Sequence, residues 1–308
     1  MANRLNDLAH KLHAFVATDN SFQRRARVLQ AIWRQEQDLA IGKRPSGEDL
    51  GSRIALNDEN RFSNLITEHA KLAANHELAA VRQGSNQLID EDRLLSNLLS
   101  SQPLCFNLFA ELQADLQLAT RIARELWPTR VLEVTAVRFE HSPGRGDFNL
   151  TEDRSAFDVF FEHTTLGGGC GFIGVEVKYH ESLDVKEATY KERYAEITSA
   201  MGCFRPDALD SLKRRPLEQI WRDHLLLGAM LQPPTQWTTG LYVFLYPRDN
   251  APCAQAAEAY RACLSIDETF APMVLEHLLD AIERHTSADW VRRVRDRYLG
   301  WDRLDSAQ

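Results

Sequence analysis

Two apolar segments in the middle of the chain contain charged residues, and this feature limits the possible folds more than any other. The segments are residues 156–162 (AFDVFFE) and 171–179 (GFIGVEVKY), whose β-branched and aromatic residues predict two β-strands. The connection between them contains Gly167-Gly168-Gly169, which suits a tight turn with positive φ angles. We therefore expect an antiparallel pair of strands that carries charged side chains.

Side chains alternate between the two faces of a strand. In the second segment this places Glu176 and Lys178 on one face, while apolar side chains occupy the other. Asp158 is the lone acid in the core of the first segment, on the same face as Phe160. An unpaired buried charge costs several kcal/mol, so these charges require an explanation. The hairpin can bring Asp158 close to Glu176 and Lys178.

Two carboxylates beside a lysine form a coherent site for phosphodiester hydrolysis. Carboxylate oxygens bind hard divalent cations such as Mg²⁺, and a bound cation polarises a phosphate and lowers the pKa of a water. A lysine can orient that water or stabilise phosphoryl charge. We therefore predict Asp158, Glu176 and Lys178 as catalytic residues, with Mg²⁺ as cofactor and Mn²⁺ as a substitute. A solvated strand face, with Asp158 paired to one of the other two, is the open alternative.

The remaining sequence changes from helical spacing to strands and back, without an internal repeat. Residues 1–99 read as helical, with Ser21 as the predicted N-cap of a second helix and residues 42–60 as a long loop. Helical spacing continues from Asp90 to Leu126. The later expected elements are strands at 130–140, 156–162 and 171–179, helices near 184–201 and 216–231, a strand at 240–246, and helices from about 253, 271 and 287.

Asp158, the glycine turn and Glu176-Val177-Lys178 together resemble the signature of the PD-(D/E)xK, or restriction endonuclease-like, nuclease superfamily. The resemblance implies an α/β (α+β) fold with an αβββαβ core, in which the acid lies on the second strand and ExK on the third. Phe157 stands where the signature has a proline that is often absent. The segment SSQPLCFNLF at 100–109 further resembles a bacterial restriction endonuclease group. The implied domains are a helical region at 1–99, the nuclease core at 100–250 and packed C-terminal helices at 251–308.

The resemblance also suggests supporting residues. Gln219 resembles a glutamine that several subfamilies carry on a helix after the ExK strand, and Glu140 resembles an additional metal-binding acid. We include Gln219 among the catalytic residues and Glu140 with Asp158 and Glu176 as metal ligands, although both positions also suit ordinary surface residues. Candidate nucleic-acid contacts are Arg145, Arg154 and Arg222. Two arginine clusters, at 23–34 and 292–297, fit either phosphate contacts or salt-bridged helix faces.

Bulk composition limits the alternatives. The net charge of −8 argues against a protein that coats nucleic acid, but a nuclease needs only a local basic surface. No apolar run is long enough for a membrane span, and the N-terminus has no secretory pattern. The cysteines are scattered without a CxxC pair, which disfavours zinc fingers and disulfide frameworks. We therefore expect a cytoplasmic protein.

The sequence and the resemblance together predict a Mg²⁺-dependent endonuclease, with DNA favoured over RNA as the substrate. A role in restriction or defence follows from the resemblance alone. The main alternative is a catalytically silent nucleic-acid-binding or assembly module with the same fold, and a third is an interaction protein that docks a partner through its helical N-terminal region. Double-strand cleavage by a chain with one site often needs two chains, so a homodimer is also an open expectation.

Overall fold

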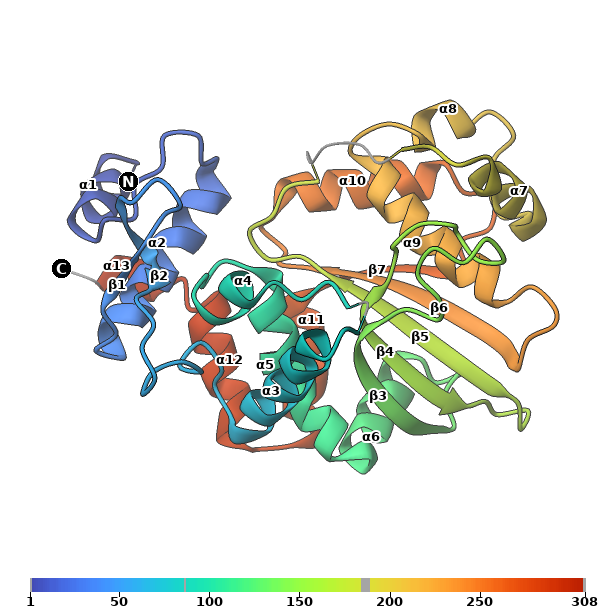
Figure 1. The fold of residues 1–308 in the computed structure, drawn as a ribbon, viewed down its shortest axis with the longest axis horizontal. Helices are drawn as coiled ribbons and strands as arrows, with labels where there is room; N and C mark the ends of the chain where they lie inside the picture. Colours follow the sequence, from blue (N-terminus) through green and yellow to red (C-terminus); the bar gives the residue numbers. More distant parts are fainter. Residues whose placement is uncertain (1, 86, 184–188, 307–308) are drawn as a thin grey trace.

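The computed structural model describes residues 2–85, 87–183 and 189–306. A five-stranded mixed sheet lies at its centre, with strand order β3-β4-β5-β6-β7 (Figure 1). β3, β4 and β5 pair antiparallel, whereas β5–β6 and β6–β7 are parallel. The strands are β3 (Glu133–His141), β4 (Phe157–Thr164), β5 (Cys170–Val177), β6 (Trp237–Tyr246) and β7 (Phe270–Val274). This sheet, preceded by helix α5, confirms the predicted restriction endonuclease-like fold.

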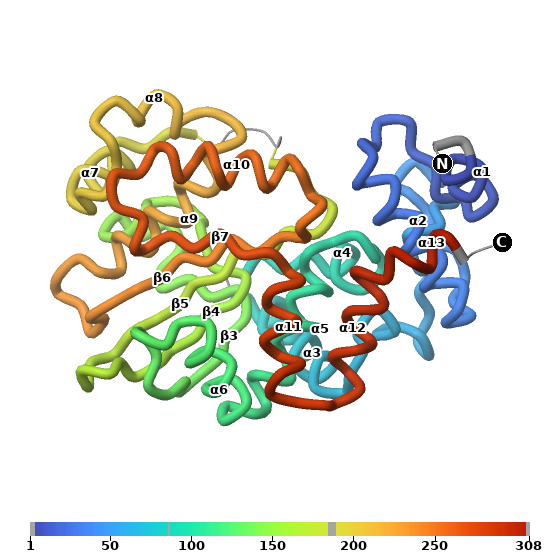
Figure 2. Tube along the Cα trace, turned by 180° about the vertical axis from the view of Figure 1, so that it is seen from behind, coloured from blue at the N-terminus to red at the C-terminus, as the bar shows by residue number. Residues whose placement is uncertain are grey.

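One face of the sheet is covered by helices from the early and late parts of the chain (Figures 1 and 2). Val159 and Phe161 of β4, with Ile173 and Val175 of β5, pack into one apolar core with these helices. The helices on this side are α3 (Glu68–Arg82), α4 (Glu91–Leu95), α5 (Ser101–Ala114), α6 (Leu116–Leu126), α11 (Leu275–His285) and α12 (Asp289–Leu299).

The opposite face has a second core of its own. Phe160 and Phe172 pack there against Trp221 and its neighbours. The sheet is thus buried on both sides, although alternation in the sequence had suggested core on one face only. The helices on this side are α7 (Glu192–Met201), α8 (Leu209–Leu212), α9 (Leu217–Met230) and α10 (Ala251–Ala262).

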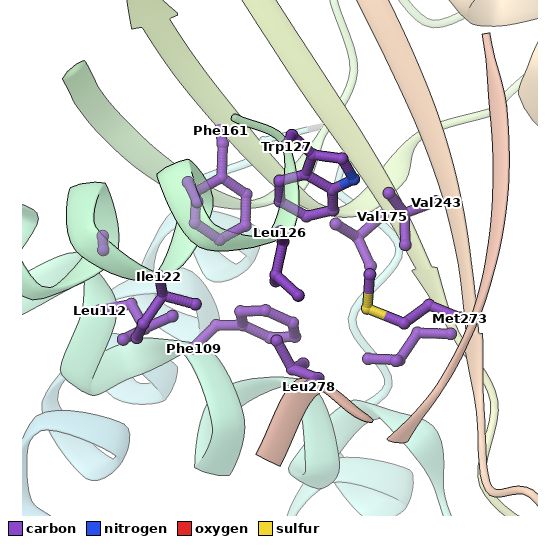
Figure 3. Close-up of a pocket in the computed structure, with 13 residues that line it drawn as sticks. Phe109, Leu112, Ile122, Leu126, Trp127, Phe161, Val175, Val243, Met273 and Leu278 are labelled. Atoms are coloured by element: carbon purple, nitrogen blue, oxygen red, sulfur yellow. The ribbon is translucent and has the colours of Figure 1, made fainter. Parts of the chain in front are cut away.

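On the face of the sheet that α5, α6 and α11 cover, a small apolar cavity lies between these helices and the strands (Figure 3). Its volume is about 20 Å³, which is room for little more than one water molecule. Its walls include Phe109, Trp127, Met273 and Leu278, and none of the lining residues is charged. This side of the sheet is therefore packed core, and a site built from charged side chains has to lie elsewhere.

Both termini belong to a small lobe beside the main body (Figures 1 and 2). Its apolar centre includes Ala9, Leu12 and Val28, with Leu304 packed against them. The helices α3 and α4 pack into the main core instead, whereas Leu98 packs against Trp33 and Ile54 of the lobe. The elements of the lobe are α1 (Ala2–Lys11), α2 (Ser21–Glu36), the hairpin of β1 (Ile41–Lys43) and β2 (Asp49–Ile54), and α13 (Arg303–Ser306).

A fully buried arginine links the lobe to the main body. Arg297 of α12 donates to Oε1 of Gln30 at 3.1 Å, to the backbone oxygen of Asn64 at 2.7 Å and to the Asn64 side chain. Its guanidinium also lies 3.9 Å from the ring centroid of Trp33. Beside it, Tyr179, two residues after the end of β5, accepts a hydrogen bond from Gln30 and donates to the backbone oxygen of Tyr298 at 3.2 Å.

Several local expectations are corrected by the structure. Asn20, rather than Ser21, caps α2, and its side chain accepts the Gln23 backbone N–H at 2.9 Å. The predicted loop at 42–60 contains the β1–β2 hairpin, whose turn uses the positive φ of Gly47. The helical spacing predicted from Asp90 to Leu126 corresponds to three helices, and Asp115 ends α5 and caps α6.

The C-terminal part brings one further correction. Residues 270–274 form the parallel edge strand β7, where a helix was expected to begin near 271. Pro272 is tolerated there because an edge strand leaves one row of backbone groups unpaired. The predicted helix near 184–201 begins at Glu192, and residues 184–188 lie outside the described part. Within the described residues, no helix is long and apolar enough to span a membrane.

Candidate active site

The β4–β5 hairpin forms as predicted, with Gly168 at φ +83° in its turn. The register pairs Val159 with Val175 and Phe160 with Gly174. Continued by one residue, it places Asp158 opposite Glu176. Oδ2 of Asp158 accepts the backbone N–H of Val177 at 2.7 Å. The acid of β4 is thereby fixed at the Glu-Val-Lys segment.

Glu176 is the centre of a hydrogen-bonded group of side chains. Its Oε1 accepts Nζ of Lys178 at 2.7 Å and Nε2 of Gln219, from α9, at 2.8 Å. Glu176 and Lys178 are 7% and 8% exposed, so little solvent screens this ion pair. Asp158, Glu176, Lys178 and Gln219, far apart in the sequence, therefore form one cluster.

Burial and mutual repulsion govern the charges in this cluster. Burial raises the pKa of Asp158 well above its usual value, the charges of Glu176 and Glu140 raise it further, and Lys178 opposes the shift. Burial alone would lower the pKa of Lys178, but the charges of Glu176 and Asp158 outweigh it and raise that pKa. Lys178 therefore stays protonated, and one ammonium group faces more than one carboxylate. A second cation would relieve this imbalance.

The donor set fits a hard divalent cation with an open coordination sphere. Asp158 and Glu176 offer carboxylate oxygens, and both hydrogen bonds to Glu176 end on Oε1. Within the described residues, no group of three or more His, Cys, Asp or Glu side chains is arranged so that it could hold a metal ion, so a cation here would have two carboxylate ligands from the protein. Mg²⁺ commonly binds through one or two carboxylates and completes its shell with water and substrate phosphate. A pair of acids in an open cleft suits that mode of binding.

Glu140 lies at the same cleft and has an unusual backbone. It is near the end of β3 with φ +47°, a conformation uncommon for residues other than glycine. Burial raises the pKa of its carboxyl group, Arg145 opposes this and Glu176 adds to it. Oε2 of Glu140 accepts a hydrogen bond from Arg145 at 3.4 Å. Its predicted role as a third metal ligand stays a prediction.

All eight residues singled out from the sequence line one cleft of about 370 Å³. Six acidic and five basic residues line it, so an anionic substrate could approach its acids only with a cation between them. The eight residues are Glu140, Arg145, Arg154, Asp158, Glu176, Lys178, Gln219 and Arg222.

The three predicted nucleic-acid contacts differ in their surroundings. Arg154 is exposed at the cleft. Arg222 bonds internally, with Nε on Asp153 at 2.9 Å and further contacts to Ser155 and Glu218. It ties the β3–β4 connection to α9, so its predicted contact with nucleic acid would require these bonds to rearrange. Arg145 is buried beside Glu140.

Sequence reasoning missed three acids that line the cleft, which are Glu181, Asp223 and Glu218. Glu181 accepts the backbone N–H of Ser101 at 2.7 Å, at the start of α5, and pairs with Arg93 at 3.4 Å. Burial alone would raise the pKa of Glu181, but Lys178 and the backbone donors outweigh it and lower that pKa. Its position three residues after Lys178 was the available signal.

Asp223 is the second missed acid. It is 5% exposed and accepts the Tyr242 hydroxyl at 3.4 Å. Burial raises the pKa of Asp223, and the charge of Glu176 adds to the shift. Because Asp223 follows Gln219 by four residues, helical spacing places both on one face of α9. That spacing could have identified it.

The two arginine clusters are largely occupied by internal contacts. Arg27 pairs with Asp19 at 2.6 Å, and Arg34 donates to the backbone oxygen of Gly51 at 3.0 Å. In the second cluster, Arg297 is fully buried. Its neighbours Arg292 and Arg295 bond to acids on their own or the adjacent helix. These contacts favour the salt-bridged interpretation of both helix faces.

Comparison with known proteins agrees with this geometry. The sequence profile of the PD-(D/E)XK nuclease superfamily matches residues 17–300. The match includes the β4–β5 hairpin, α9 and most of the small lobe. No curated protein and no solved structure gives a significant match.

Proposed function

The chain belongs to the PD-(D/E)XK nuclease superfamily, and on this basis we propose that it is a metal-dependent endonuclease that hydrolyses phosphodiester bonds of DNA. The observation that carries the proposal is the cluster at the end of the hairpin, in which Asp158 lies opposite Glu176 and Lys178 bonds to Glu176. A silent relative would have no need to retain two buried acids and a buried lysine, each costly to desolvate.

Each side chain has a distinct part in the proposed reaction. A bound Mg²⁺ or Mn²⁺ would polarise the scissile phosphate and lower the pKa of a water. Asp158 and Glu176 supply the oxygens for that cation. Lys178 remains charged, positions the attacking water and stabilises negative charge on the phosphoryl group. Gln219 holds Glu176 in place through Oε1. Glu140 supports the cation in the same proposal.

The substrate is proposed to be DNA, which the exposed Arg154 would contact through phosphate. Arg145 is a second phosphate contact, and Arg222 becomes a third if its internal bonds open. A cytoplasmic role in restriction or defence, and a homodimer that cuts both strands, complete the proposal.

The decisive experiment is cleavage of supercoiled and linear DNA with Mg²⁺, with Mn²⁺ and with chelator. We expect nicking or linearisation that needs a divalent cation and is lost in Asp158→Asn and Lys178→Gln. Glu133→Gln is a matched control, because Glu133 is an exposed acid on the neighbouring strand β3. Cleavage that survives both site substitutions would refute the assignment. Binding of DNA without cleavage of DNA or RNA under either metal would favour the silent binding module instead.

A further inference from the structure

A second cleft adjoins the active-site cleft, and the two share Glu140 and Arg145. The second cleft measures about 700 Å³ and is lined by residues of α3 and β3. Among the described strands, β3 is an edge strand that pairs with β4 alone. The two clefts therefore form one path that leads from Asp158 past Arg145 to the free edge of the sheet.

Arg145 stands at the junction with an unsatisfied donor. Its side chain is 4% exposed, and Nη2 makes one long bond of 3.4 Å to Glu140. Nη1 is buried and has no hydrogen-bond partner among the described residues. A buried charged group without partners is unfavourable unless a ligand completes its bonds. A phosphate oxygen is a suitable acceptor for a guanidinium N–H.

A second unsatisfied polar atom lies at the active-site cleft. Gln102, which lines it, donates through Nε2 to the backbone oxygen of Leu88 at 3.2 Å. Its Oε1 is buried and accepts no hydrogen bond within the described part of the chain. The cleft thus offers an open acceptor as well as an open donor, a combination that suits a ligand with both phosphate and hydrogen-bonding groups.

The second cleft is lined by neutral hydrogen-bonding groups and by four charged residues, the acids Glu77 and Glu140 and the arginines Arg138 and Arg145. Ser85, Gln87 and Gln113 line it. His141 and Ser142 line it as well. Apart from Arg145, the arginine in this cleft is Arg138, which is paired with Glu162 at 2.8 Å. One phosphate anchor at the inner end, followed by partners for sugars and bases, suits a strand better than a free anion.

We propose that Arg145 binds the phosphate next to the scissile one, and that a nucleic-acid strand runs from the active-site cleft into the second cleft along β3. This inference rests on the proposed nucleic-acid substrate and adds the direction in which the strand leaves the site. Both experiments below use metal-free protein, so they do not depend on cleavage.

The first experiment measures how salt weakens binding of a fluorescent single-stranded DNA. Each phosphate contact contributes about 0.7 to the slope of log K against log salt. We expect Arg145→Gln to lower the slope by about 0.7 and to weaken binding about 10-fold or more. Arg145→Lys should keep the slope but bind more weakly, because an ammonium lacks the planar fork. A merely structural arginine would leave the slope unchanged, and that result would overturn the proposal.

The matched control is Arg121→Gln, since Arg121 is exposed on α6 outside both clefts. Its slope and affinity should equal those of the wild type. If Arg145→Gln does not fold, as judged by thermal unfolding, the DNA affinity of Arg145→Lys still tests whether Arg145 anchors a phosphate. An affinity of this variant equal to that of the wild type would refute a specific anchor.

The second experiment maps the path by photo-cross-linking from single cysteines on α3, after Cys170→Ser removes the exposed cysteine. His76 lines the second cleft, whereas its neighbour Asn75 does not. We expect His76→Cys to cross-link DNA and Asn75→Cys not to. Equal cross-linking from both positions, or none from either, would overturn the path.

If cleavage occurs without this cross-link, the path is wrong and the proposed function stands. If the cross-link and the salt slope are as expected but no DNA is cut, the path stands and the proposed cleavage activity is wrong.

Discussion

Asp158 accepts a hydrogen bond from the backbone N–H of Val177 at 2.7 Å, so the acid of β4 is attached to the residue between Glu176 and Lys178. The bond lies just beyond the last ladder pair of the hairpin, Val159 with Val175. A side chain thus continues the strand pairing where the backbone ladder stops. The relative positions of the two acids are therefore set by the hairpin before any ligand binds.

The variant Asp158→Asn should separate the structural role of this side chain from the role of its negative charge. Its side-chain oxygen can still accept the Val177 N–H, but no charge remains. Because burial and nearby acids raise the pKa of Asp158, its ionised form lowers stability at neutral pH. We expect metal-free Asp158→Asn to melt about 2–4 °C higher for each kcal/mol relieved, and to lose cleavage by about 100-fold or more. A lower melting temperature with intact cleavage would contradict this view of the site.

Lys178→Gln should be destabilising and partly rescued by metal. Removal of one partner from a buried ion pair typically costs about 3–5 kcal/mol, and Lys178 is the cation bonded to Glu176. We expect urea unfolding to show this loss, and Mg²⁺ to raise the stability of the variant. The control is Lys71→Gln, whose exposed pair with Glu68 should contribute at most about 1 kcal/mol. Equal losses in the two variants would argue against a buried charge cluster.

Gln219→Leu tests the positioning of Glu176. The substitution removes the 2.8 Å hydrogen bond to Oε1, and bonds to charged groups contribute about 1.5–3 kcal/mol. We expect kcat/KM for DNA cleavage to fall about 10- to 100-fold, and the melting temperature to fall by about 2–4 °C for each kcal/mol lost, because the bond is already present in the free protein. Gln117→Leu, at an exposed position of α6, should leave kcat/KM unchanged. Wild-type kcat/KM in Gln219→Leu would remove this residue from the site.

The pH dependence of stability should carry the signature of His224. This residue is buried between the hydroxyls of Tyr260 and Thr269, at 2.8 and 2.9 Å. Burial lowers its pKa from 6.5 to about 3. Between these values the unfolded chain binds a proton that the folded chain does not, so stability present above pH 6.5 is lost as the pH falls towards 3.

The variant His224→Gln keeps hydrogen-bonding groups at this position, but its side chain does not bind a proton between pH 7 and pH 5. From pH 7 to pH 5 the unfolding free energy of the wild type should therefore fall by about 2 kcal/mol more than that of the variant. Urea unfolding at the two pH values measures the difference. Parallel losses in the two proteins would show that His224 is not the responsible group.

Arg297→Lys should reveal how strongly the small lobe is joined to the body. Lysine cannot reproduce the bonds to Gln30 and both Asn64 oxygens, because its ammonium lacks a planar fork. We expect a loss of about 3 kcal/mol in unfolding free energy, since buried acceptors are left without donors. Arg293→Lys, on an exposed position of the same helix, is the control and should change stability little. A similar small change in Arg297→Lys would count against this link.

The parts of the fold that local pattern determines were predicted well. Alternation and a glycine turn were enough for β4 and β5, and each predicted strand overlaps the observed one. The grouping of Asp158, Glu176 and Lys178 followed from the same pattern, because a hairpin with this register can bring Asp158 only to Glu176 and its neighbours. Gln219 and Glu140, by contrast, were predicted from the family resemblance, and they reach the same cleft from α9 and β3.

What could not be predicted depends on contacts distant in sequence. β7 is short, contains Pro272, and forms because the buried strand β6 lies beside it. The contact of Glu181 with Ser101 likewise requires the end of β5 to meet the start of α5. The spacing of residues along the chain predicts neither the pairing of β7 with β6 nor the contact between Glu181 and Ser101. The open donor of Arg145 is also invisible in the sequence, where this residue is one of two arginines in a loop.

Tyr179 follows the lysine of the site directly, and its hydroxyl is held by the backbone of Tyr298. A chain emerging from the ribosome can build the hairpin early, yet it lacks this support until α12 has been translated. The order of synthesis therefore delays completion of the site: the strand that carries Glu176 and Lys178 is secured by one of the last helices to appear.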